Sequence, residues 1–419
     1  MSLRLLLPLV ALTVACNGKD STADTGPVPT YYADVEPILT ESCVNCHVSG
    51  GIGPMPLTSY EEVGPVADWV ASAVVERRMP PAQVADGCNE YVTDPALTEE
   101  ERDIIARWAD GGAPEGDPAD ALDIEPEPDP LELSRIDLRI PMPTPYSPEI
   151  QPDEYRCFLL DWPEEEDVYV TGFGVAPGEL SIVHHVIAFV ATPELLDTFE
   201  SIDAADPGPG YSCYGGPFGD EFPSEPINWL GAWVPGAVGW DNPEGTGVFV
   251  EPGSKIIVQM HYNSDSTTGE LSDQTELLLK LDDEVERVGW TSPITNRLWP
   301  ATHSMEIPAN SEGVTHRAEI PWVGTSTLYD VGMHMHTFGR SGELSVTHAD
   351  GSETCLVRFD TWDFNWQRSY RLAEPLVLSE GDTFNVTCTF DNPTDEDINW
   401  GEGTGDEMCL GVVFQAEGG

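Results

Sequence analysis

The sequence predicts a multidomain protein in which a small all-α domain is followed by two all-β antiparallel sandwiches. The chain has 419 residues, which at about 150 residues per domain is enough for several cores. Apolar residues recur with helical spacing within residues 31–118. From residue 131 onward, short β-rich runs separated by turn residues take their place. Such runs are typical of antiparallel sandwiches, and we expect two of them, at 131–284 and 285–419.

Residues 1–15 have the layout of an export signal, with Arg4 ahead of an apolar run. Small residues before Cys16 resemble the lipobox of bacterial lipoproteins, in which the signal is cleaved and the cysteine carries lipid. Thr13 departs from the usual leucine, so simple secretion is the alternative. We expect a protein of the bacterial cell envelope, in the periplasm or at the cell surface, with a lipid anchor on Cys16 that holds it at the membrane. Residues 16–30 are polar and small, as suits a flexible tether.

The helical part begins at residue 31, and its periodic stretches lie at 35–39, 66–77 and 98–108. Thr98 followed by Glu101 has the spacing of a capping box, and two glycines at 111–112 are a stop signal. Residues 119–130 are acidic and rich in proline. This composition indicates a linker between the helical and β-rich parts.

Residues 43–47 read C-V-N-C-H, the pattern in which two thiols form thioethers to a haem and the imidazole ligates iron. Cys43, Cys46 and His47 would therefore bind a covalent haem c, although a redox or zinc pair is the alternative. Met79 is the expected sixth ligand because it lies between the middle and last helices, where class I cytochromes c present methionine. Met55 is its rival, and a core methionine is the structural alternative for both. We expect residues 31–118 to be cytochrome c-like.

Five further histidines fall into three compact settings, namely His184 with His185, His261, and His334 with His336. Alternate residues of a strand point to the same face, so His334 and His336 can chelate one metal. Adjacent His184 and His185 would point to opposite faces, so both can bind one ion only where the strand is bulged or ends. A single such histidine is often a satisfied polar residue in a sheet, but five together favour metal binding.

The candidate thioether ligand is Met408, in the segment Gly405-Asp406-Glu407-Met408-Cys409 near the C-terminus. By spacing alone Met408 would be an ordinary buried methionine. Imidazole with thioether is a soft ligand set, which among exported proteins favours copper. The aromatic residues at 362, 364 and 366 alternate with polar residues and indicate a half-buried strand. We expect the other histidines to be surface or loop residues: His303, His316 and His348.

Four motifs together resemble the type II copper, ascorbate-dependent monooxygenases, the group of peptidylglycine alpha-hydroxylating and dopamine beta-monooxygenases. The resemblance covers about residues 131–415. It implies two successive eight-stranded jelly-roll-like sandwiches that face each other across an open cleft. The motifs are, in chain order, His184-His185, Gln259-Met260-His261-Tyr262, His334-Met335-His336 and Asp406-Glu407-Met408-Cys409.

The resemblance also implies two copper ions and assigns their ligands. In that family, reduced copper activates dioxygen, a substrate C–H bond is broken, and one oxygen atom is inserted. The electron-transfer copper would be held by His184, His185 and His261. The copper that binds oxygen would be held by the catalytic set His334, His336 and Met408.

Nine cysteines in an exported chain predict disulfides, and six remain once Cys16 and the haem pair are set aside. Spacing alone does not choose among their pairings. The resemblance suggests Cys157 with Cys213, and Cys388 with Cys409. Cys88 and Cys355 are then either an interdomain bridge or two free thiols.

The net charge and three departures from the family pattern indicate which kinds of partner and substrate to expect. Acidic residues number 74 and basic residues 18, so the net charge is −56. Nucleic acid is therefore a poor partner, and the Asp-Glu pairs are expected to be mostly solvated charge. Gly332 stands where the peptide-hydroxylating enzyme has an arginine for its substrate's carboxylate, and Leu410 and Val412 replace polar and aromatic neighbours of that pocket. A neutral or cationic small molecule is thus expected rather than a glycine-extended peptide.

These observations predict an extracytoplasmic monooxygenase that hydroxylates a C–H bond of a small substrate with O2. The fused haem would take the role of ascorbate and would itself be reduced by an external electron donor. A tethered donor has a high effective concentration, which suits a site that must be reduced in each turnover. The alternatives are a non-catalytic haem and copper redox or copper-binding protein, and a purely structural pair of sandwiches.

Overall fold

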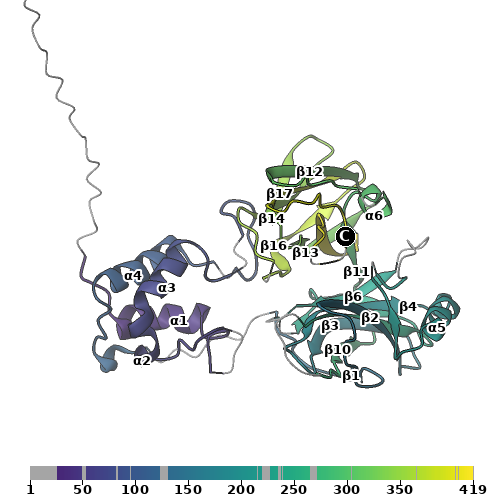
Figure 1. Cartoon of the computed structure of the whole chain (residues 1–419), viewed down its shortest axis with the longest axis horizontal. Helices are drawn as coiled ribbons and strands as arrows, with labels where there is room; N and C mark the ends of the chain where they lie inside the picture. The colour runs from purple at the N-terminus through teal and green to yellow at the C-terminus, as the bar shows by residue number, and fades with distance from the viewer. Residues whose placement is uncertain are drawn as a thin grey trace, which may run out of the picture.

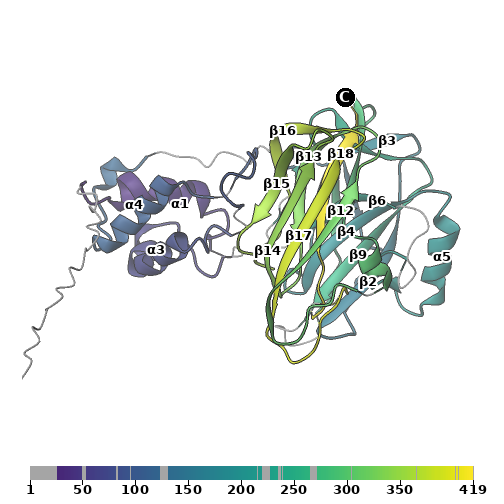
Figure 2. The ribbon, with the colours of Figure 1, turned by 90° about the horizontal axis from the view of Figure 1, so that it is seen from above.

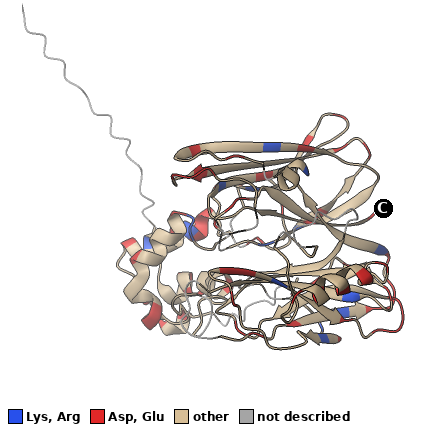
Figure 3. Cartoon of the chain, turned by 45° about the vertical axis from the view of Figure 1, so that its right-hand side comes forward, with Lys and Arg blue, Asp and Glu red and all other residues tan. Residues whose placement is uncertain are grey.

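The computed structural model describes residues 26–49, 53–81, 84–94, 96–122, 131–214, 216–218, 227–234, 237, 239–264, 271–302, 304–364, 366–401, 403 and 405–418. The predicted export signal, Cys16, His303 and most of the predicted linker lie outside these residues. A helical part lies beside two β-rich bodies (Figure 1). Acidic positions are spread over all three parts rather than gathered in one (Figure 3). Among the described helices, none is long and apolar enough to cross a membrane.

The helical part consists of short elements around an apolar core. Trp108 and Ile105 of the last helix are fully buried there, together with Tyr31. The predicted capping box is confirmed, since the Thr98 hydroxyl accepts from the backbone N–H of Glu101 while the Glu101 carboxylate accepts from that of Thr98. The elements are η1 (Tyr31–Val35), α1 (Glu36–Ser42), α2 (Tyr60–Val63), η2 (Gly64–Val66), α3 (Ala67–Val75), α4 (Glu99–Asp110) and η3 (Pro118–Asp120).

The first sandwich has two layers, with strand orders β1-β10-β3-β8 and β6-β4-β9-β2-β5. Its core lies between them and includes Phe158, Phe173 and Tyr262. The helix α5 (Leu196–Ala205) follows β4 and covers one edge of the second layer. The strands are β1 (Leu138–Pro141), β2 (Asp153–Asp161), β3 (Val168–Ala176), β4 (Val183–Ala191), β5 (Tyr211–Ser212), β6 (Asn228–Trp233), β7 (Trp240–Asp241), β8 (Thr246–Val250), β9 (Lys255–Asn263) and β10 (Glu276–Asp282).

The second sandwich packs the sheet β12-β17-β14-β15 against β11, β18, β13 and β16. Figure 2 shows its long strands running beside one another, at the side where the helical part approaches. The elements are β11 (Arg287–Ile294), α6 (Leu298–Thr302), β12 (Ser311–Pro321), β13 (Ser326–His334), β14 (Gly339–Thr347), β15 (Glu353–Phe359), β16 (Tyr370–Leu378), β17 (Thr383–Asn392) and β18 (Leu410–Glu417).

The two sandwiches share hydrogen bonds through β11, which pairs with β18 of the second and with β6 and β8 of the first. The ladder with β8 is parallel, which departs from the purely antiparallel sheets that the sequence predicts. The cause is local: the backbone N–H groups of Glu286 and Arg287 bond to the Gly245 carbonyl, so the chain leaves the first sandwich alongside β8. The β-rich character of the chain beyond residue 131 is confirmed.

Residues 84–93, here called the strap, join the helical part to the second sandwich. The Val92 N–H donates to the Arg371 carbonyl at 2.8 Å, and the Ala373 N–H donates to the Glu90 carbonyl at 2.9 Å, so the strap pairs with β16. The Ala85 N–H donates to the Arg358 carbonyl at 2.7 Å on β15. The strap therefore bonds through its main chain to an edge strand of each sheet of the second sandwich.

Three disulfides are present among the described residues. They join Cys157 to Cys213, Cys388 to Cys409, and Cys88 to Cys355. The first two are the pairs that the family resemblance suggested. The third ties the strap to β15, so the two cysteines left open by the sequence form an interdomain bridge.

Removing the Cys88–Cys355 disulfide is expected to lower the stability of the protein and to weaken the attachment of the strap to the second sandwich. Its cysteines are 267 residues apart in the chain, and a loop of that size stabilises the fold by about 3–5 kcal/mol when it is closed. Cys88→Ser/Cys355→Ser should lower the free energy of unfolding by that order and expose the strap to protease. Denaturant unfolding and limited proteolysis measure both effects, with Asp94→Ala, just outside the strap, as the control. Unchanged stability and an unchanged cleavage pattern would show that the strap's hydrogen bonds suffice.

Candidate metal centres

The first histidine group consists of His184, His185 and His261, which β4 and β9 bring together. These strands pair antiparallel, with His185 opposite His261. The register shifts between Val183 and His185, so β4 is bulged at His184. This bulge is the feature that two adjacent histidines need to reach one point, because it turns the first side chain toward the face of the second.

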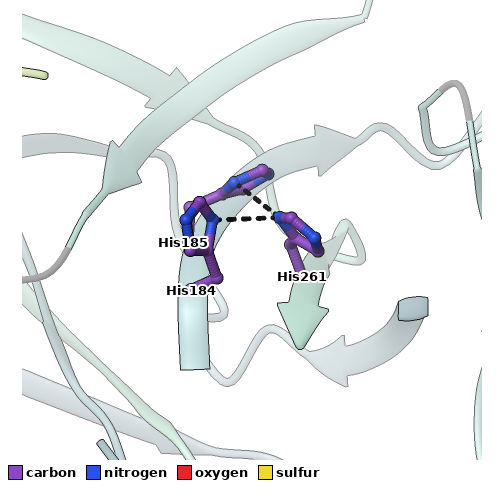
Figure 4. A group of neighbouring side chains, drawn as sticks. All are labelled: His184, His185 and His261. Carbon is purple, nitrogen blue, oxygen red and sulfur yellow. Dashed lines mark hydrogen bonds between the residues drawn. The ribbon is translucent and has the colours of Figure 1, made fainter. Parts of the chain in front are cut away.

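The three imidazoles converge on one small volume (Figure 4). His261 Nδ1 lies 3.1 Å from the Nδ1 atoms of both His184 and His185. Burial lowers the pKa of His184 to about 4 and that of His185 well below its usual value, and it also lowers the pKa of His261. The rings are therefore neutral near pH 7, which is the form that binds metal.

Asp153 fixes the orientation of His261. Its Oδ1 atom lies 2.9 Å from His261 Nε2, and this contact places the ring proton on Nε2 and the lone pair on Nδ1, toward the other histidines. The ring of Tyr155 stacks on His261 at 4.1 Å. Sequence reasoning did not single out Asp153 or Tyr155. Both lie near His261 because β2 pairs with β9, which places Tyr155 opposite His261.

Asp153→Ala is expected to weaken metal binding at this group by about 10- to 100-fold, because the ring would lose the acceptor that sets its tautomer. A competition titration with a copper chelator measures the change. Asp161→Ala is the matched control, since Asp161 ends the same strand and its side chain is 89% exposed. Equal copper affinities for the two variants would exclude this role for Asp153.

The second histidine group consists of His334, the last residue of β13, and His336. Met333 and Met335 are buried in the sandwich core, so the two histidines face the other way, as the alternation of a strand predicts. Their rings lie 5.0 Å apart. His334 Nδ1 bonds to Gln367 Oε1 at 2.7 Å, and His336 Nδ1 bonds to the Asp406 carbonyl at 3.1 Å.

The bond to Gln367 leaves His334 Nε2 available as a ligand, because Nδ1 carries the proton that it donates. The His336 ring also bonds to the backbone of Gly403. Burial lowers the pKa of His336 to about 3 and also lowers that of His334. Met408 lies just before β18, is 6% exposed, and precedes the cysteine that is bonded to Cys388. The second histidine group thus has neutral rings, with a buried thioether on the adjoining segment.

Glu407 connects the segment of His336 with that of Met408. It is fully buried, and its carboxylate accepts from the backbone N–H groups of His336 at 2.9 Å and Phe338 at 2.6 Å. Burial raises the pKa of Glu407 to about 7. Glu407 is therefore an exception among the Asp-Glu pairs, which were expected to be mostly solvated charge, because its carboxylate accepts from backbone donors inside the fold.

The ring of Phe364 lies between the two histidine groups and contacts both of them. The ring stacks on His184 at 5.2 Å with an interplanar angle of 23°, and it lies edge-on to His336 at 6.0 Å. The open cleft implied by the resemblance is therefore filled at this point. The half-buried strand predicted around residue 364 is also wrong, since β15 ends at Phe359 and β16 begins at Tyr370. The residues between form a connection held by the Trp362 indole N–H, which donates to the His336 carbonyl.

A cavity of about 420 Å³ opens beside the second group, and its lining residues are Thr337, Gly339, Trp362, Asp363 and Phe364. Leu410 and Val412 do not line it. Leu410 is buried in the core of the sandwich and Val412 packs against that core, because β18 lies inside the sheet between β11 and β13. The two residues that were expected to neighbour the substrate pocket are therefore core contacts. Gly332 is covered by the backbone of Arg368.

The C-x-x-C-H segment follows α1 as a tight turn, in which the His47 N–H bonds to the Cys43 carbonyl at 2.9 Å. Both thiols are free, and burial raises the pKa of Cys43 to about 12. His47 Nδ1 bonds to the Met55 carbonyl at 2.8 Å, which leaves Nε2 as the ligand atom. Met79 is half-buried in the turn after α3, with its N–H bonded to the Ala73 carbonyl.

The remaining described histidines lie apart from these groups. His316 bonds through Nε2 to the Glu306 carbonyl and packs on Trp299. His348 lies at the end of β14, where Nδ1 is 3.5 Å from Asp382. Both are partly exposed.

The family match among known proteins lies in the second sandwich. Residues 297–415 match the family described as copper type II ascorbate-dependent monooxygenase, C-terminal domain. That range contains His334, His336 and Met408. The chain is also 23% identical over 260 residues to a tyramine beta-hydroxylase of Caenorhabditis briggsae, a match that covers 57% of this chain and 40% of that protein. The chain thus spans less than half the length of this relative.

Two solved structures that resemble the chain do so only weakly. The VP2 subviral particle of infectious bursal disease virus has a TM-score of 0.19 at 10% identity, covering 67% of this chain and 72% of that one. A two-domain protein from Bacteroides fragilis has a TM-score of 0.17 at 10% identity, covering 63% of this chain and 85% of that one. Such TM-scores do not indicate a shared fold.

Proposed function

We propose that this chain is an extracytoplasmic copper-dependent monooxygenase that hydroxylates a C–H bond of a small molecule with O2. The observation that carries the proposal is the second histidine group with the buried Met408, inside the range that matches the copper monooxygenase domain. Two neutral imidazoles and a thioether are a donor set that suits copper in both oxidation states. Copper bound there would supply the activation of dioxygen.

The first histidine group would hold the second copper, which serves electron transfer. Its three Nδ1 atoms already converge, and Asp153 holds the ring of His261 in the tautomer that binds metal. Burial keeps all three rings neutral and limits access of water to them. The role of these residues is thus to hold a metal at a fixed place in each redox state.

The helical part would carry a covalent haem c on Cys43 and Cys46, with His47 as the axial ligand. The haem would accept electrons from an external donor and pass them on. His47 is oriented for this role, because the Met55 carbonyl holds Nδ1 and leaves Nε2 for iron. Met79, in the turn after α3, remains the expected sixth ligand, with Met55 as its rival.

The cavity beside His336 would receive the substrate. Trp362 and Phe364 supply aromatic surface and Asp363 supplies a carboxylate, which suits a neutral or cationic organic molecule. The net charge of −56 favours a cation over an anion. The relative from Caenorhabditis briggsae is named for an amine, which agrees with this choice. A lipid anchor on Cys16 would hold the enzyme at the bacterial envelope.

The test is the metal content of protein exported through a haem-maturing host and supplied with copper, followed by reduction with a cytochrome donor. About one iron and two coppers per chain are expected. His47→Ala should abolish reduction of copper by the cytochrome donor while copper content and reduction by ascorbate persist. His348→Ala is the matched control. One iron without tightly bound copper would overturn the proposal, and tight copper without any O2-dependent product would favour a non-catalytic redox or copper-binding protein.

A further inference from the structure

A continuous series of side-chain contacts connects the first histidine group with the second sandwich. The Tyr155 ring is stacked on His261, and the Tyr214 ring meets Tyr155 edge-on at 5.6 Å with an interplanar angle of 88°. Tyr214 directly follows Cys213, whose disulfide to Cys157 fixes it beside β2. The position of the Tyr214 hydroxyl is therefore set by the strand that supports His261.

The Tyr214 hydroxyl forms hydrogen bonds with residues of the second sandwich. It donates to Asp406 Oδ2 at 2.7 Å and accepts from the Gly403 N–H at 2.7 Å. The backbone carbonyl of Asp406 accepts from His336 Nδ1, and Met408 lies two residues further on. The same aspartate thus contacts the first sandwich through its side chain and a residue of the second histidine group through its backbone.

We propose that the hydrogen bond between Tyr214 and Asp406 is a latch that sets the separation of the two histidine groups. Tyr214 is then a positioning residue. This inference rests on the proposed function insofar as the two groups hold metals that must exchange an electron.

Other contacts also join the two sandwiches. Loss of the latch should therefore change the separation of the histidine groups without unfolding the protein. β11 pairs with strands of both sandwiches, and the Arg371 guanidinium donates to the Asp241 carbonyl at 3.0 Å. These contacts would keep the sandwiches associated without the latch. At the histidine groups, Phe364 contributes ring stacking, which tolerates sliding, whereas a hydrogen bond has a defined length and direction.

Tyr214→Phe is the decisive variant, because it keeps the ring against Tyr155 and removes only the hydroxyl. In copper-loaded protein, pulsed dipolar EPR between the two Cu(II) ions should give one short separation in the parent and a longer, broader distribution in Tyr214→Phe, with equal copper content. Asp406→Asn should retain the short separation, because the amide oxygen still accepts from the hydroxyl. Tyr169→Phe, on β3, is the control for loss of a hydroxyl elsewhere.

A second measurement needs no metal. In metal-free protein, amide hydrogen exchange at residues 405–409 should be about five- to tenfold faster in Tyr214→Phe than in the parent, since that segment loses its bond to the first sandwich. Equal separations and equal exchange rates in parent and variant would overturn the latch and leave the proposed function standing. If the parent protein binds no copper, the proposed function is overturned. The exchange rates of metal-free protein would still test the latch.

Discussion

Replacing His334 with alanine is expected to lower bound copper from about two ions per chain to about one and to reduce product formation at least about 100-fold. The reason is that His334 and His336 supply the imidazoles of the second group, and one ring with a thioether does not hold copper tightly. The first group contains none of the altered atoms, so its copper should stay. Elemental analysis and a product assay with an ascorbate-reduced enzyme measure the two effects.

His316→Ala is the matched control for this prediction, because His316 lies on β12, apart from both histidine groups, and its ring bonds to the Glu306 carbonyl. It should keep both coppers and full activity. Loss of both coppers in His334→Ala would indicate that the two groups form one cooperative site. Full retention of copper would show that His334 is not a ligand, and the proposed function would then lose its central observation.

Glu407→Leu is expected to destabilise the protein by roughly 3–5 kcal/mol. The leucine removes the carboxylate that accepts from the buried N–H groups of His336 and Phe338, and each unsatisfied donor costs roughly 1–3 kcal/mol. The segments of His336 and Met408 would also lose their common anchor. Copper at the second group should therefore weaken together with stability.

Glu407→Gln separates the two effects, since it keeps the size of the side chain and one acceptor oxygen. Its loss of stability should be about half that of the leucine variant, and its copper affinity should be closer to that of the parent. Denaturant unfolding of metal-free protein and a copper titration measure each variant. Equal stability of Glu407→Leu and the parent would contradict the anchoring role.

Local sequence signals predicted much of the candidate sites. The alternation of a strand predicted that His334 and His336 share a face, and the core positions of Met333 and Met335 agree with it. The adjacent pair His184 and His185 required a bulge, and β4 is bulged there. These predictions succeeded in placing side chains because the direction of a side chain along a strand depends on residues only one or two positions away.

Other features depend on contacts between distant segments, and no periodicity encodes them. The bond from Asp153 to His261 and the pairing of Cys88 with Cys355 each join separate elements. Glu407 shows the same principle, since an acidic pair is indistinguishable in sequence from solvated charge until the fold surrounds it with backbone donors.

By itself, the sequence determined the β-rich class, the five clustered histidines and the C-x-x-C-H segment, because these depend on residue type and short spacing. Only the tertiary structure decided that Phe364 lies between the histidine groups, that Leu410 belongs to the core, and that the strap ties the helical part to β16. Such features follow from how strands far apart in the chain pack against one another, which is a property of the whole fold.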